Sequence, residues 1–167
     1  MGVDMDHLWS PWRMSYIQDN QPKRRCLFCY VLKMEDGTEN LIVKRGTQAF
    51  VILNRYPYTS GHVMVVPYRH AGTLDELDDS ICSDMMRLVR QAIAAIGSVY
   101  KPDGFNVGAN LGVAAGAGIA QHLHFHVVPR WGGDTNFMPV IGHTKVISEA
   151  LEITCSKIAA GFNRYKP

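Results

Sequence analysis

The sequence predicts one compact domain that contains both β-strands and amphipathic helices. Its 167 residues, 47% of them hydrophobic and 19% charged, suit a single globular domain with a sizeable core. Two β-rich runs separated by a turn predict a hairpin, and a later segment carries apolar residues at helical spacing. A second full domain is not expected in a chain of this length.

The first elements along the chain are predicted to be strands. Residues 1–40 show little periodicity beyond CLFCYVLKM at 26–34, which could begin a short helix. LIVKR at 41–45 precedes the runs AFVILN at 49–54 and HVMVVP at 62–67. The segment between the last two runs, RYPYTSG, contains a proline and a glycine that mark a turn, so these runs are predicted to pair as a hairpin.

A long helix is predicted after residue 80. Thr73-Leu-Asp-Glu76 has the form of a capping box, and KPDG at 101–104 is typical of a helix end. Between them, apolar residues recur at the spacing of one helical face: Ile81, Met85, Leu88, Val89, Ala92, Ile93, Ile96 and Val99.

The remaining elements are a strand, a loop and a second helix. FNVGANLG at 105–112 predicts the strand, and GVAAGAG at 112–118 predicts a flexible, glycine-rich loop. A helix is expected from about residue 146 to residue 160, ending near Gly161.

Charge and hydropathy exclude several kinds of partner. Lys and Arg number 17 against 15 Asp and Glu, with no long run of either sign, so no nucleic-acid partner is expected. No apolar run approaches the roughly 18 residues that span a bilayer, and the N-terminus lacks the apolar centre of a signal peptide. We therefore expect no membrane partner and a cytoplasmic location. Four cysteines are too few for a disulfide scaffold.

Three histidines alternate in QHLHFHVVPR, residues 121–130. Successive side chains of a strand point to opposite faces, so His122, His124 and His126 would share one face. A lone histidine would be interpreted as a core or surface residue, but three in register opposite an apolar face favour a functional site. A neutral imidazole is nucleophilic near pH 7 and a protonated one donates to phosphate oxygens, so such a row suits chemistry on phosphate esters. His62, which opens the second hairpin strand, could join it.

The motif QHLHFHVVPR resembles that of the histidine triad (HIT) family, and the resemblance covers most of the chain from Cys26 onward. It implies an α+β fold with a five-stranded antiparallel sheet and flanking helices, and a homodimer with a ten-stranded sheet. Residues 1–167 would form one HIT domain, with an N-terminal extension at 1–25, a core at 26–130 and a C-terminal extension and helix at 131–167. The segments WSPWRMSYI and PRWGGDTNFMPVIGHTKV resemble the diadenosine tetraphosphate phosphorylase and hydrolase branch.

The resemblance also implies roles for individual residues. His124 would be the nucleophile that forms a nucleotidyl intermediate, His126 and His62 would hold and neutralise the phosphate, and His122 matches the first triad position. Where many relatives carry Ser or Gln in the loop before the triad, this chain has Gly118, whose backbone amide could replace that contact. The implied nucleotide-binding positions are Leu53, Asn54, Asn110, Gly118, Ile119 and Trp131.

A structural zinc ion is a further implication. Some bacterial members of the family bind zinc through a C-x-x-C pair, a histidine after the hairpin and the first triad histidine. Cys26, Cys29, His70 and His122 occupy those positions, and two thiolates with two imidazoles suit tetrahedral zinc with no open position. The alternative, an unmetallated pair of reduced thiols, stays open at this point. No organic cofactor is expected.

The function implied is transfer or hydrolysis of an adenylyl group from a dinucleoside polyphosphate through a His–AMP intermediate, with inorganic phosphate as a candidate acceptor. A nucleoside phosphoramidase or a hydrolase of the same superfamily is the alternative within this class. Two other classes remain: a metallohydrolase in which the histidine row binds a catalytic metal, with Asp134 as a conceivable ligand, and a nucleotide sensor without turnover.

Overall fold

The computed structural model describes residues 26–137, 141 and 146–165. The chain divides into two compact units, of which one comprises residues 25–134 and 147–167 and contains all the helices and strands named below. The other unit comprises residues 1–24 and 135–146. The predictions for the N-terminal extension and WSPWRMSYI fall outside the described residues, and the assignment of residues 1–167 to one domain stays a prediction.

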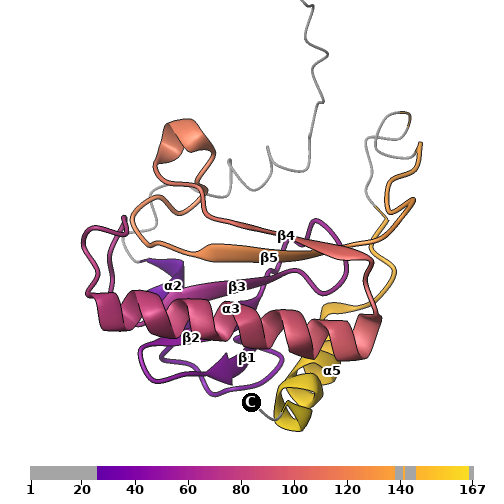
Figure 1. Ribbon diagram of the computed structural model, residues 1–167, viewed down its shortest axis with the longest axis horizontal. Helices are drawn as coiled ribbons and strands as arrows, with labels where there is room; N and C mark the ends of the chain where they lie inside the picture. The colour runs from indigo at the N-terminus through magenta and orange to yellow at the C-terminus, as the bar shows by residue number, and fades with distance from the viewer. Residues whose placement is uncertain (1–25, 138–140, 142–145, 166–167) are drawn as a thin grey trace, which may run out of the picture. The chain divides into compact units, whose positions relative to one another are not determined.

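The larger unit is an α+β domain built on one antiparallel sheet (Figure 1). Its strand order is β1-β2-β3-β5-β4, so the histidine-bearing strand lies between the hairpin and an edge strand. This confirms the predicted five-stranded sheet with flanking helices. Along the chain the elements are α2 (Leu27–Val31), β1 (Ile42–Arg45), β2 (Ala49–Leu53), β3 (Val63–Pro67), α3 (Asp79–Tyr100), β4 (Gly104–Gly108), η1 (Val113–Ala115), β5 (Phe125–Arg130) and α5 (Leu151–Arg164).

The hairpin β2–β3 forms the centre of the core. All ten of its residues are buried, and the strands pair in continuous antiparallel register from Ala49–Pro67 to Leu53–Val63. β5 continues the sheet beside β3, with Met64 opposite His126. Because β2 and β3 are paired along their whole length, they fix the backbone at both ends of the turn that carries His62.

Helix α3 packs across the sheet and contacts β2, β3 and β5 (Figure 1). The predicted apolar face is largely buried, which confirms the helix. Its start differs from the prediction: Asp78 is the N-cap, and Glu76 instead accepts a hydrogen bond from the Gly72 N–H at 2.7 Å. The capping-box residues therefore close a turn that precedes the helix.

Helix α5 packs against α3 and β1. It begins at Leu151 rather than near residue 146, and it runs through Gly161 to Arg164. A Cβ atom at Gly161 would lie 2.9 Å from the Ala95 carbonyl oxygen, so this glycine allows two helices to pack closely and does not end the helix.

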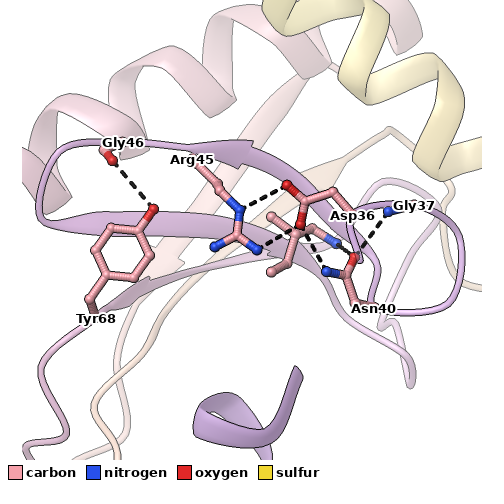
Figure 2. Close-up of polar contacts among 7 residues, drawn as sticks. Asp36, Gly37, Asn40, Arg45, Gly46 and Tyr68 are labelled. Carbon is pink, nitrogen blue, oxygen red and sulfur yellow. Dashed lines mark hydrogen bonds and ion pairs between the residues drawn. The ribbon is translucent and has the colours of Figure 1, made fainter. Parts of the chain in front are cut away.

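The loop between α2 and β1 is closed by a polar network (Figure 2). Asp36 accepts two hydrogen bonds from the Arg45 guanidinium, at 2.8 and 2.7 Å, and one from Asn40 Nδ2 at 2.9 Å. The Arg45 guanidinium lowers the pKa of Asp36. The buried Asn40 side chain accepts from the N–H groups of Gly37 and Ile42. These contacts fix the path from the C-x-x-C segment to the sheet.

None of the helices among the described residues has an apolar stretch long enough to cross a membrane. The structure describes a single chain, so the predicted homodimer stays a prediction.

Candidate active site and metal-binding cluster

The histidine site lies where the β2–β3 turn meets the second half of β5. Asn54 follows β2 and donates its N–H to the carbonyl of His62, which precedes β3, at 2.9 Å. Thr59, within the turn, donates its hydroxyl to the Pro129 carbonyl of β5 at 2.9 Å. The turn is thereby closed on itself and bonded to β5, and His62 faces the histidine strand.

Three imidazoles form a continuous chain in this site. His62 Nε2 lies 2.9 Å from His126 Nδ1, and the two ring centroids are 5.1 Å apart. The ring of His124 then packs edge-on against that of His126, with centroids 4.9 Å apart. His62 is fully buried, and His124 is almost so. The structure thus places His62 beside the histidine row, next to His126.

The protonation of His124 follows from a single hydrogen bond. Its Nδ1 lies 2.9 Å from the carbonyl oxygen of His122, and a carbonyl oxygen can only accept, so Nδ1 carries the proton. Burial lowers the pKa of His124, and this effect outweighs the hydrogen bond to the carbonyl, which raises the pKa. The lowered pKa favours the neutral ring. A neutral imidazole protonated at Nδ1 has its lone pair on Nε2, which is the nucleophilic form.

The backbone N–H of Tyr58 determines which ring nitrogens of His62 and His126 carry the proton. It donates to His62 Nδ1 at 3.1 Å, so Nδ1 is an acceptor and neutral His62 carries its proton on Nε2. That proton points to His126 Nδ1, which leaves the proton of neutral His126 on its own Nε2. The pair therefore forms a directed relay that ends in a donor.

His122 belongs to a different cluster. One donor atom from each of Cys26, Cys29, His70 and His122 lies within 4.8 Å of the others. His122 Nδ1 is 3.2 Å from Cys26 Sγ and 3.7 Å from Cys29 Sγ, and His70 Nδ1 is 3.4 Å from Cys29 Sγ. The structure thus brings together all four residues predicted to bind metal.

The donor set of this cluster fits a cation. His122 Nε2 lies 2.9 Å from the Pro67 carbonyl, so Nε2 carries the proton and Nδ1 turns its lone pair toward the sulfurs. Burial lowers the pKa of His122, which keeps it neutral. Burial and the adjacent Cys26 raise the pKa of Cys29, because two neighbouring thiolates repel each other unless a cation lies between them. These four residues could bind a metal ion.

Phe28 connects the cluster with the imidazole chain. It lies between the two cysteines in sequence and is fully buried. Its ring centroid is 5.3 Å from that of His122 and 5.1 Å from that of His124. One aromatic ring therefore contacts a potential metal ligand and the candidate nucleophile.

The predicted strand of three histidines is shorter than expected. β5 begins at Phe125, so only His126 of the three lies within it. Leu123 and Val127 are buried as predicted for the apolar face. Hydrogen bonds to the chain near the end of β3, among them Leu123 N–H to the Ala71 carbonyl at 2.7 Å, hold residues 122–124 outside the ladder.

The predicted nucleotide-binding residues differ in their surroundings. Asn54 lies in the site, with Nδ2 3.3 Å from His62 Nδ1. Leu53, the last residue of β2, is buried in the core. Asn110 donates to the Gly116 carbonyl at 3.3 Å and so supports the glycine-rich loop.

The other predicted positions lie on loops. Gly118 is exposed and Ile119 is partly buried in the loop that precedes the histidines. Trp131, partly buried, directly follows β5 and donates its N–H to Asp134 Oδ2 at 3.2 Å.

Asp134 is occupied by an ion pair with Arg130, whose Nη2 lies 2.9 Å from Asp134 Oδ1. Among residues 26–137, 141 and 146–165, the potential metal cluster is the cysteine–histidine one, and Asp134 is not part of it. This disfavours the metallohydrolase in which the histidine row and Asp134 hold a catalytic metal.

Tyr58 and Phe28 were missed as site residues at the sequence level. Tyr58 lies in a turn where tyrosine signals nothing by itself, and Phe28 looks like an ordinary core residue. Phe28 lies within the C-x-x-C segment and Tyr58 lies in the turn just before His62, and these positions are the signals that could have identified them.

Comparison with known proteins shows the family of the chain. The HIT domain family model matches residues 37–133. An AP-4-A phosphorylase of Mycobacterium tuberculosis is 42% identical over 168 residues, which cover 96% of this chain and 86% of that protein. An adenosine 5′-monophosphoramidase of Schizosaccharomyces pombe is 34% identical over 105 residues, 63% of this chain and 74% of that protein.

A solved structure shows the same fold. The Zn-bound histidine triad family protein of Mycobacterium smegmatis has a TM-score of 0.68 at 24% identity, and the match covers 84% of this chain and 95% of that one. The chain belongs to the histidine triad (HIT) family, as the motif predicted. Within that family it is one of the enzymes.

Proposed function

We propose that this enzyme transfers an adenylyl group from diadenosine tetraphosphate to inorganic phosphate through a covalent intermediate on His124. The observation that carries the proposal is the 2.9 Å hydrogen bond from His124 Nδ1 to the His122 carbonyl, which leaves the Nε2 lone pair as a nucleophile beside the His126–His62 relay. The 42% identity to an AP-4-A phosphorylase supports the choice of substrate.

The reaction divides into two displacements at the same phosphorus. In the first, His124 Nε2 forms a bond to the α-phosphorus, the bond from that phosphorus to its bridging oxygen breaks, and ATP leaves with the electron pair. In the second, a phosphate oxygen attacks the α-phosphorus, the bond to Nε2 breaks, and ADP is released. His126 Nε2–H, at the end of the relay, would donate to the phosphate oxygens on which charge develops.

The nucleotide contacts belong to the same proposal. Asn54, at the end of β2, would contact the ribose, and the core residue Leu53 would support the pocket wall from below. Asn110 would hold the glycine-rich loop, whose N–H groups at Gly118 and Ile119 would contact phosphate oxygens. With no side chain at Gly118, space would remain for a free phosphate ion as acceptor. Trp131 is the further candidate contact.

The cysteine–histidine cluster would hold a structural zinc ion. In tetrahedral zinc sites the Zn–S distance is about 2.3 Å and the Zn–N distance is about 2.05 Å, so neighbouring ligand atoms would lie about 3.4–3.8 Å apart. The observed separations of 3.2, 3.4 and 3.7 Å are close to this range. The Zn-bound relative of the same fold supports this assignment. When bound, the ion would neutralise both thiolates and fix the four side chains.

A cytoplasmic homodimer completes the proposal, as an expectation from the sequence and the family. No membrane or nucleic-acid partner and no organic cofactor form part of it.

Product analysis tests the proposed reaction. The purified protein is incubated with diadenosine tetraphosphate, with and without inorganic phosphate, and the nucleotides are separated by chromatography. We expect ADP and ATP in equal amounts, formed only when phosphate is present. AMP and ATP formed independently of phosphate would identify a hydrolase instead, and cleavage of adenosine phosphoramidate alone would identify a phosphoramidase. Binding of diadenosine tetraphosphate without any product would identify a nucleotide sensor.

A further inference from the structure

Tyr58 is placed against both imidazoles of the relay. Its ring centroid lies 4.7 Å from that of His62 at an interplanar angle of 35°, and 6.0 Å from that of His126 at 29°. The tyrosine ring is thus tilted against the imidazole of His62 and stacks at a larger separation on that of His126. Tyr58 is 38% exposed, so it separates part of the relay from solvent.

The backbone of Tyr58 acts on the same pair. Its N–H donates to His62 Nδ1 at 3.1 Å, and this bond sets the direction of the relay from His62 to His126. The next residue, Thr59, is tied to the Pro129 carbonyl of β5 at 2.9 Å. Tyr58 therefore has little freedom to move away from the imidazoles, and its ring and its N–H constrain His62 together.

We propose that Tyr58 is a positioning residue, whose ring holds His62 and His126 in the orientation that presents the His126 Nε2 proton to the reacting phosphate. This rests on the proposed function of His124 as nucleophile. A ring packed against two imidazoles restricts their rotation, and a general acid contributes only when it is held within hydrogen-bond reach of its target. Removing the ring leaves both histidines and the Tyr58 N–H present but loosens their geometry.

The experiment compares three variants of the full-length protein. Tyr58→Leu removes the ring and keeps the N–H, Tyr58→Phe keeps both and removes only the hydroxyl, and Tyr56→Leu removes a more exposed ring, 52% exposed, from the same turn. We expect Tyr58→Leu to lower kcat by about 10- to 100-fold, a part of the full contribution of a general acid, with KM changed less than about twofold. Tyr58→Phe and Tyr56→Leu should both stay within about threefold of the parent kcat.

Three results would overturn the proposal. An increase in KM at unchanged kcat for Tyr58→Leu would show that the ring contacts the bound nucleotide instead of positioning the two imidazoles. An equal loss in Tyr56→Leu would show a general effect of the turn. A loss in Tyr58→Phe as large as that in Tyr58→Leu would assign the effect to the hydroxyl. If Tyr58→Leu does not fold, Tyr58→Met, which keeps a long apolar side chain without a ring, takes its place.

A second readout separates this proposal from the proposed reaction. Long-range ¹⁵N–¹H correlation spectra of the substrate-free protein report which ring nitrogen of each histidine carries the proton. We expect the neutral rings of His62 and His126 to be protonated at Nε2 in the parent and in Tyr58→Phe. In Tyr58→Leu they should become mixtures, because a His62 ring without the packed tyrosine can turn away from the N–H of residue 58. If the parent fails to cleave diadenosine tetraphosphate but the spectra change as expected, the reaction is wrong and the positioning of the relay stands. Unchanged spectra in Tyr58→Leu would overturn the positioning role whatever the substrate.

Discussion

Two regions of the site use neighbouring histidines of one segment in opposite ways. His122 directs Nδ1 to sulfur atoms because its Nε2–H donates a hydrogen bond to the Pro67 carbonyl. His124, two residues later, has the reverse arrangement, because its Nδ1–H donates a hydrogen bond to the carbonyl of His122. The position of a single backbone carbonyl therefore decides which nitrogen of each ring keeps its lone pair.

The comparison teaches that spacing alone does not define a histidine's role. The alternation of QHLHFHVVPR treats the three rings as equivalent, whereas in the structure one joins a thiol cluster and two join an imidazole chain. We expect substitutions in the two regions to give different results: loss of turnover in the imidazole chain, and loss of metal and stability in the cysteine–histidine cluster.

The largest expected effect is that of His124→Asn. The asparagine amide can still donate to the His122 carbonyl, as Nδ1 does, but it has no nucleophilic nitrogen in place of Nε2. Turnover of diadenosine tetraphosphate should fall by about 10³-fold or more, with nucleotide binding and zinc content preserved. Steady-state kinetics, calorimetric binding and metal analysis measure these three quantities. A variant that kept near-parent turnover would remove His124 as the nucleophile.

The next effect is expected in the cluster. Cys26→Ser should lower the zinc content below about one ion per chain. It should also lower the free energy of unfolding by on the order of 3 kcal/mol, because loss of a metal is among the changes that destabilise a protein most. For a chain of this size that corresponds to a decrease in melting temperature of about 6–12 °C. Cys82→Ser is the matched control, because it makes the same chemical change in α3, outside the cluster. Equal melting temperatures for the two variants would argue against a bound metal.

The smallest effect tests whether the two regions are coupled. Phe28→Leu removes the ring that contacts both His122 and His124, and Phe50→Leu removes an equally buried ring that stacks on Tyr68. Both should cost about 1–2 kcal/mol of stability, since a partial cavity forms in each case. Only Phe28→Leu should also lower kcat, by about three- to tenfold, measured well below the melting temperature. Parallel losses in both variants would show that the regions act independently.

Much of the fold could be predicted because its signals are local. The strands of the hairpin and the apolar face of α3 follow from periodicity over short windows, and both are confirmed. Gly161 was misinterpreted because a glycine near a helix end has two meanings, and the packing of α5 on Ala95 decides between them. Similarly, Glu76 reaches back to Gly72 instead of capping α3, which depends on the path of the preceding turn.

The candidate site shows the same division. The residues of the metal cluster were predicted from the family resemblance, and the place of His62 beside the histidine row was predicted from the hairpin; the structure brings both groups together. The hydrogen bonds that fix the ring protons are made by backbone groups of Pro67 and Tyr58. Because any residue type has these groups, the sequence cannot predict the bonds. The role of Phe28 likewise depends on three-dimensional packing, because a buried phenylalanine is common in any core.

The distance along the chain between the cluster's ligands has a consequence for the unfolded state. Cys26 and His122 are 96 residues apart, so a metal ion that joined them would close more than half of the chain into a loop. A permanent cross-link across about 100 residues reduces the conformational entropy of an unfolded chain by an amount worth about 4.7 kcal/mol at 25 °C. The ion would therefore cross-link the unfolded chain as well as join four side chains of the folded protein. Metal retained during unfolding should leave a more compact denatured ensemble, whereas chelation should release it to the dimensions of an open chain.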